Sequence, residues 1–192
     1  MNEMKNAWIT ILCSVCLWSA CTEEVVPSIY TGPDGINFYY DQVGPYDADP
    51  YPGGSSVQSG SLSNSSPRDT LWFRILVMGN LSDKERSFSL KQSTLSAIDS
   101  SSYYTGGVKV AVPGVNYIAF DDPEMQKYYV IPPAVSYVDV PVIMMRDPEA
   151  FVGSSKFSMQ YCLHFEIVPT DELKILDPRF YRAKLTFTQW SW

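Results

Sequence analysis

The stretch that decides the fold is "FSMQYCLHFEIV", Phe157 to Val168. Large apolar side chains alternate in it with smaller or polar ones, which is the two-residue period of a β-strand with one buried face. The pattern predicts an inward face made of Phe157, Met159, Tyr161, Leu163, Phe165 and Ile167. The outward face then carries Ser158, Gln160, Cys162, His164 and Glu166.

The same alternation recurs on either side of this segment. In "YVDVPVIMM", Tyr137 to Met145, one face is expected to hold Val138, Val140, Val142 and Met144. Pro141 on the other face has no amide hydrogen to donate, so we expect this strand at a sheet edge or a bulge. In "YRAKLTFTQWSW", Tyr181 to Trp192, the inward face is expected to hold Tyr181, Ala183, Leu185 and Phe187.

Shorter or more uniform segments complete the set of expected strands. "LWFRILVM", Leu71 to Met78, is almost continuously apolar, as in a central strand. "VKVAV" places Val108, Val110 and Val112 on one face, and "NYIAF", Asn116 to Phe120, is expected as a short strand. Turns separate these segments and no helical period is found. The sequence therefore predicts an all-β fold, an antiparallel immunoglobulin-like β-sandwich of eight or nine strands over residues 70–192.

Size and charge limit the functional classes. A chain of 192 residues is long enough for one well-buried core and too short for two ordinary domains with a linker. The formal net charge of −7 provides no basic surface to neutralise phosphates, so we expect no nucleic-acid partner.

The N-terminal residues predict a secreted, lipid-anchored protein. The apolar run "AWITILCSVCLW" (7–18) has the length of a signal-peptide core and is shorter than a membrane span. The following "WSAC" resembles a bacterial lipobox, which implies a signal peptide over residues 1–20 and lipid attachment at Cys21. An ordinary signal peptide with an incidental cysteine is the alternative. Glu23 and Glu24 resemble the signal that sends Bacteroidota lipoproteins to the outer face of the outer membrane.

The segment between the signal peptide and the sandwich is expected to be a tether. Residues 21–69 are rich in Pro, Gly and Ser, and such a composition buries too little apolar surface to offset the entropy of ordering. One short strand is expected within it, at "GINFYY", residues 35–40.

From residue 70 onward, the order of features resembles an uncharacterised family of Bacteroidota outer-membrane lipoproteins with immunoglobulin-like domains. The segments that carry the resemblance are "RILVMGNLSDKERSFSL", "VPGVNYIAF", "VIPPAVSYVDVPVIMMRD", "FEIVPTDEL" and "YRAKLTFTQW". The middle part also resembles Calx-β-like modules. The first resemblance implies a place beside SusC/SusD-like nutrient-uptake systems with a TonB-dependent transporter. Its members usually continue beyond the last strand, so the resemblance implies that a C-terminal strand is lacking after Trp192.

Two sets of side chains could carry chemistry in the folded domain. Cys162, His164 and Glu166 share one strand face, but no oxyanion element accompanies them, and an outward polar face with an incidental thiol is the preferred interpretation. A pair of acidic turns, with Asp121 in the first and Asp147 in the second, is expected at one pole of the sandwich. Calcium binding there stays open, because Asp-Pro is equally an ordinary turn signature.

The third candidate is the terminal "WSW". Trp190 and Trp192 continue the outward phase of their strand, so the two indoles could form a flat platform for sugar rings or a partner protein. A register shift that turns both indoles inward is the alternative.

These observations predict a non-catalytic, lipid-anchored surface protein without a metal or other cofactor. Its expected work is glycan or peptide capture beside a transporter and receptor complex. The alternative is a structural or adhesive subunit, such as a pilus-associated lipoprotein, that accepts a partner's strand.

Overall fold

The structure is a computed structural model that describes residues 30–43, 59–94 and 107–192. The chain divides into two compact units, Met1–Thr31 and Gly32–Trp192, and the elements described below belong to the second. The predicted signal peptide (1–20), the predicted lipid site Cys21 and much of the predicted tether lie outside the described residues. Within the part that is described, no helix is long and apolar enough to cross a membrane.

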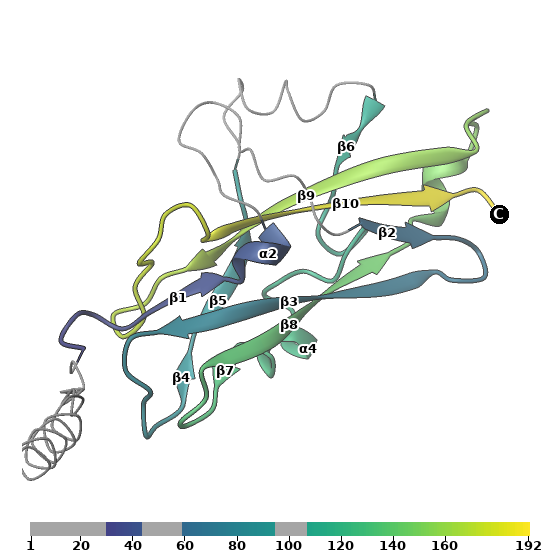
Figure 1. The fold of residues 1–192 in the computed structure, drawn as a ribbon. Coiled ribbons are helices and arrows are strands. Elements are labelled where there is room, and N and C mark those ends of the chain that lie inside the picture. The colour runs from purple at the N-terminus through teal and green to yellow at the C-terminus, as the bar shows by residue number, and fades with distance from the viewer. Residues whose placement is uncertain (1–29, 44–58, 95–106) are drawn as a thin grey trace, which may run out of the picture. The chain divides into compact units, whose positions relative to one another are not determined.

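The second unit is an all-β sandwich, as the sequence predicts (Figure 1). One sheet has the order β1-β3-β8 and contains β1 (Gly35–Phe38), β3 (Arg68–Met78) and β8 (Tyr137–Met145). The other has the order β2-β10-β9-β5, with β6 also paired to β9, and contains β2 (Ser59–Leu62), β5 (Ser89–Gln92), β6 (Lys109–Val110), β9 (Ser158–Val168) and β10 (Arg182–Trp190).

Small elements connect and close the two sheets. A two-stranded ribbon pairs β4 (Arg86–Ser87) with β7 (Val130–Ile131), and three helical turns are α2 (Tyr40–Val43), α4 (Pro123–Gln126) and η2 (Pro148–Phe151). The sandwich departs from the predicted antiparallel pattern at two places, because β2 runs parallel to β10 and β6 runs parallel to β9.

Aromatic side chains from both sheets meet in the core. Phe38 of β1, Phe73 of β3 and Phe165 of β9 form edge-to-face pairs with ring centroids 5.1–6.2 Å apart. Phe120 adds a tilted contact to Phe165 at 5.3 Å. The inward face predicted for β9 is confirmed from Met159 to Ile167, since alternate side chains there are buried. Burial of such large rings is the main term that holds the two sheets together.

Several predicted side-chain directions are wrong. Phe157 is 72% exposed, because β9 begins at Ser158 and the alternation does not extend to its neighbour. Cys162 and His164 are buried although they lie on the face predicted to be outward. In "VKVAV", the side chain in the core is Ala111, while Val110 is about half exposed.

The central and edge positions predicted for two strands are confirmed. β3 lies between β1 and β8, and β8 with Pro141 is at the edge of the sheet, where a missing amide hydrogen breaks no ladder. "NYIAF" was expected as a strand but forms only isolated bridges, from Tyr117 to Pro113 and to Met144. The Asp122 amide donates to the main-chain oxygen of Ala119 at 3.0 Å, and this turn ends the pairing. Ile118 and Phe120 are buried in the core without belonging to a strand.

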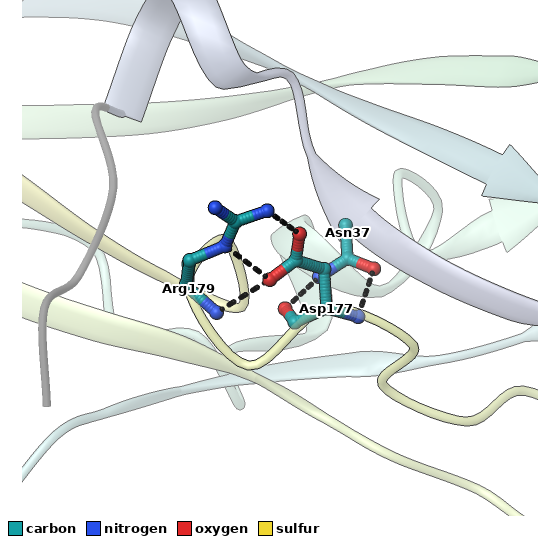
Figure 2. A network of polar contacts seen from close by, with 3 residues as sticks. All are labelled: Asn37, Asp177 and Arg179. Atoms are coloured by element: carbon teal, nitrogen blue, oxygen red, sulfur yellow. Dashed lines mark hydrogen bonds and ion pairs between the residues drawn. The ribbon is translucent and has the colours of Figure 1, made fainter.

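The edge of β1 is covered by the segment that precedes β10. The Ile36 amide donates to the main-chain oxygen of Lys174 at 2.9 Å. Figure 2 shows the side-chain part of this contact: the Asn37 amide donates to the main-chain oxygen of Asp177 at 2.6 Å and accepts from its amide at 3.2 Å. The Asp177 carboxylate in turn accepts from the Arg179 guanidinium, and this hydrogen bonding lowers the pKa of Asp177. β1 is therefore held on both sides.

The expectation of a flexible segment up to residue 69 is wrong for its last part. β2 pairs with β10 over four residues, and β3 already begins at Arg68. The sequence of β2, "SGSL", is polar because only Leu62 points into the core. Main-chain hydrogen bonds to β10 stabilise it, and these do not depend on side-chain type.

Candidate functional site

The two C-terminal tryptophans are brought together on the surface at the end of β10. Their indole centroids are 4.9 Å apart with an interplanar angle of 33°. Trp192 is 60% exposed, whereas Gln189, on the opposite phase of the strand, is buried. The alternative in which both indoles turn inward is therefore wrong. The outward phase of β10 holds for Trp190, which is partly exposed, and Trp192 lies beyond the end of the strand.

The two rings are tilted to each other by 33°, so they do not form the expected flat platform. Side chains two residues apart on one face of a regular strand are separated by about 6.5–7 Å, which would leave the rings side by side. Here β10 ends at Trp190, and the two ring centroids are closer than that spacing. Trp192 keeps 60% of its surface exposed beside its neighbour.

Hydrogen bonds on two sides hold the segment that carries the indoles. The Trp190 indole N–H donates to the Ser61 hydroxyl of β2 at 3.1 Å. The Asn64 main-chain amide donates to the main-chain oxygen of Trp192 at 2.7 Å, and its side-chain amide donates to that of Ser191 at 3.2 Å. On the other side, the Ser191 amide donates to the main-chain oxygen of Phe157 at 3.0 Å. The main chain that carries the exposed Trp192 ring is thus held on both sides.

Polar groups lie next to the segment that carries the indoles. The hydroxyls of Ser63 and Ser65 are 3.0 Å apart in the loop that also provides Asn64. The Arg146 guanidinium donates to the main-chain oxygen of Trp190 at 3.1 Å. The surface combines an exposed indole with hydroxyl, amide and guanidinium groups. Ser61 and Asn64 were missed at the sequence level because they lie in a stretch whose composition is that of a flexible tether.

The Cys162 and His164 side chains do contact each other, with Sγ and Nε2 3.3 Å apart, but both are buried. Burial raises the pKa of Cys162 to about 11, so the thiol stays protonated near neutral pH and is a poor nucleophile. Glu166 instead forms ion pairs with Lys91 at 3.1 Å and Arg182 at 2.9 Å. Burial opposes ionisation of Glu166, but hydrogen bonding to Lys91 and the charge of Arg182 outweigh it and lower its pKa. The preferred interpretation of an outward polar face is therefore wrong for Cys162 and His164, which are buried, whereas Glu166 is partly exposed and ion-paired.

The two acidic turns do not converge, which corrects the calcium hypothesis. Tyr117 and Met144 form an antiparallel bridge, so the chain runs toward Asp121 in one direction and toward Asp147 in the other. Among the residues with described positions, no group of three or more acidic, His or Cys side chains could hold a metal ion.

Each turn also has a local structural role for its carboxylate. Asp122 accepts from the Glu124 amide at 2.8 Å and caps α4. Asp147 accepts from the Glu149 amide at 2.9 Å and caps η2. Capping of this kind is the ordinary use of Asp before Pro.

Comparison with known proteins gives only distant likeness. No protein-family model and no curated protein matches the chain. The apo form of the Calx CBD1 domain is similar over 82% of this chain and 98% of its own length, with 11% identity and a TM-score of 0.41. A Bacteroides ovatus ATCC 8483 protein, described as a candidate carbohydrate binding protein, is similar over 68% of this chain and 34% of its own, with 12% identity and a TM-score of 0.42. CBD12 from CALX1.2 has 11% identity and a TM-score of 0.39, over 70% of this chain and 42% of its own.

Proposed function

We propose that the chain is a non-catalytic, lipid-anchored protein of the bacterial cell envelope that captures glycans through the Trp190 and Trp192 indoles. The observation that carries the glycan part is the 60% exposed indole of Trp192, on a main chain held by hydrogen bonds beside a loop of Ser and Asn side chains. Sugar rings present an apolar C–H face and a rim of hydroxyls. An aromatic ring next to amide and hydroxyl groups complements both.

Rigidity of the site favours this function. A ligand that binds a mobile side chain must offset the entropy lost when that side chain is ordered, about 0.5–1.5 kcal/mol for each one. The hydrogen bonds of Asn64 and Ser191 have already fixed the Trp192 segment in the free protein. Capture of a weakly held, neutral ligand is the kind of binding that gains most from such preorganisation.

The proposal of a lipid anchor is based on the lipobox-like "WSAC", which ends at Cys21. With three acyl chains, attachment is effectively permanent, because each buried methylene contributes about 0.8 kcal/mol. Glu23 and Glu24 support presentation at the cell surface, where a glycan-binding domain would deliver its ligand to a neighbouring TonB-dependent transporter.

A glycan array probed with the full-length protein tests the glycan function. We expect binding to at least one neutral oligosaccharide class, and loss of that signal in Trp192→Ala. Trp72→Ala is the matched control, because Trp72 is also exposed but lies on β3 in the other sheet. Retention of the signal in Trp192→Ala, or binding to peptides alone, would contradict the proposal.

Metabolic labelling with a radioactive fatty acid tests the anchor separately. We expect label in the wild-type protein and none in Cys21→Ser, with the variant released from the membrane fraction. Cys162→Ser is the control and should label normally, since the Cys162 thiol is buried in the folded domain. Label in Cys21→Ser would show that the lipid is attached elsewhere or that the lipobox resemblance is misleading.

The strand-accepting alternative has less support. The edge of β1 is covered by Lys174 and Phe180, whose main-chain oxygens accept from β1 amides. The C-terminal half of β8 is bonded to residues 116–118. Pro141 interrupts the remaining half of that edge, which makes it a poor template for another strand.

A further inference from the structure

The sheet face that carries the Trp190 indole continues along β10, between β2 and β9 (Figure 1). Side chains of residues that are paired in register point to the same face of a sheet. Trp190 is paired with Ser158 of β9, and its indole N–H donates to the Ser61 hydroxyl of β2 at 3.1 Å. The register of the three strands therefore identifies which side chains follow the indoles on this face.

The side chains that follow the indoles are neutral and polar. Thr188 is paired with Gln160 on one side and with Ser61 on the other, and Thr186 is paired with Ser59. We call the set the neutral strip, and its members are Ser59, Ser61, Ser158, Gln160, Thr186 and Thr188. Three of the six are exposed and the other three are partly exposed. The strip thus presents five hydroxyl groups and one amide next to the indole pair.

Charge is confined to the other half of the same face. The neutral strip ends at Thr186, whose partner Cys162 is buried. Beyond Cys162, Glu166 forms ion pairs with Lys91 at 3.1 Å and with Arg182 at 2.9 Å. Exposed positions of a soluble domain are commonly charged, so an uncharged half-face beside an exposed indole favours a neutral ligand.

The strip offers side chains for binding and few main-chain groups. β10 is paired with β2 on one side and with β9 on the other from Thr186 to Gln189, so its main-chain donors and acceptors there are used within the sheet. This arrangement does not suit a partner that binds as an added strand. The Cα atoms of Thr186 and Trp190 are separated by about 13 Å, at roughly 3.3 Å for each residue, which is longer than one sugar ring.

We propose that the indole site binds an unbranched, neutral oligosaccharide that lies along β10. One sugar ring packs against the indoles, and the hydroxyls of the following rings exchange hydrogen bonds with the neutral strip. Thr188 and Gln160 are the first strip residues after Trp190, so they determine the preference for a chain over a short sugar. This inference rests on the proposed glycan function and adds the length and charge of the ligand.

Calorimetric titration of the full-length protein with sugars of defined length tests the inference. The probes are linear gluco-, manno- and xylo-oligosaccharides of two to six units. In the series that binds, we expect the hexasaccharide to bind at least about tenfold more tightly than the disaccharide, because only the longer chain reaches the strip. Equal affinity at all lengths would overturn this inference and leave the glycan proposal standing. Absence of binding in all three series would also overturn it, while the glycan array decides separately whether the protein captures glycans at all.

Variants in the strip separate its contribution from that of the indoles. The double variant Gln160→Ala with Thr188→Ala should weaken hexasaccharide binding at least about tenfold and leave the affinity for the disaccharide unchanged. Trp192→Ala should weaken the binding of both sugars. Thr70→Ala is the matched control, since Thr70 is a partly exposed threonine of β3 in the other sheet, and circular dichroism checks that each variant is folded. An equal loss of hexasaccharide affinity in Thr70→Ala, or an equal loss for both sugars in the double variant, would contradict a role of the strip in chain binding.

Discussion

At the residue scale, Phe165 is the centre of the core. It contacts Phe38, Phe73 and Phe120, with ring centroids 5.1–5.5 Å away, and so joins both sheets and the segment before α4. Its alternation with polar neighbours in β9 was sufficient to predict that it is buried. The aromatic rings that Phe165 contacts could not be predicted, because the alternation of side chains within one strand says nothing about which distant segments pack against it.

Truncation of Phe165 should therefore strongly destabilise the protein. We expect Phe165→Ala to lower the free energy of unfolding by about 3–5 kcal/mol, through lost burial and the cavity left behind. Urea unfolding followed by circular dichroism measures this. Phe157→Ala is the control, and because Phe157 is 72% exposed its effect should stay within about 0.5 kcal/mol. Similar values for the two variants would contradict the placement of Phe165.

At the scale of elements, the strands most poorly predicted are those stabilised by main-chain pairing. β2 is short, runs parallel to β10 and sends only Leu62 into the core, so its side chains show little alternation. β6 lies within the strand predicted at "VKVAV", but it has only two residues and its parallel pairing with β9 was not predicted. Long strands such as β9 and β10 bury one whole face, so their period identifies them from sequence alone. The burial of Cys162 and His164 was not predicted for a related reason. Other segments of the chain cover the second face of β9, and the sequence of β9 alone does not identify them.

β1 illustrates how tightly one element can be enclosed. Gly35 pairs with Met78 of β3 and also bridges to Lys174. A Cβ atom at Gly35 would overlap both the Leu176 side chain and the main-chain oxygen of Lys174. The latter belongs to the backbone and cannot rotate away.

Gly35→Ala should thus destabilise the protein by about 1–3 kcal/mol, the usual cost of overpacking, and thermal unfolding would measure it. Gly60→Ala in β2 is the comparison. A Cβ there would meet the end of the Met144 side chain, which is flexible and can move. We expect a smaller loss for Gly60→Ala, and the reverse order would contradict the enclosure of β1.

At the scale of the whole molecule, the segment that carries the indoles is held by three parts of the chain that are distant in sequence. Its contacts come from Ser61 and Asn64, at and after β2, and from Phe157 before β9. The sequence predicted the class of fold, but only the folded chain brings these three parts together around Trp190 and Trp192.

Alkaline pH should unfold the domain, because the folded domain buries several tyrosine hydroxyl groups and a cysteine thiol in their neutral form. Burial raises the pKa of Tyr129 well above its ordinary value of 10.0 and that of Tyr117 to about 12. In the unfolded chain these tyrosines lose their protons at lower pH than in the folded protein. Their contribution to the free energy of unfolding is therefore fully present below about pH 10, and it is lost as the pH rises through their pKa values in the folded protein.

Thermal unfolding from pH 7 to 12 measures this loss. Tyr129→Phe should reduce it, and since the Tyr129 hydroxyl has no hydrogen-bond partner in the described part of the chain, the variant should be at least as stable as wild type at pH 7. Tyr137→Phe is the control at an exposed position. A flat profile up to pH 12 would contradict the burial of these groups.

The most direct test of glycan capture is the dissociation constant of an oligosaccharide identified on the array, measured by calorimetry for wild type, Trp192→Ala, Trp192→Phe and Trp72→Ala. We expect Trp192→Ala to weaken binding at least about tenfold, as for a central aromatic contact residue. Trp192→Phe should retain most of the affinity and Trp72→Ala all of it. A dissociation constant unchanged in Trp192→Ala would contradict glycan capture by the indole pair.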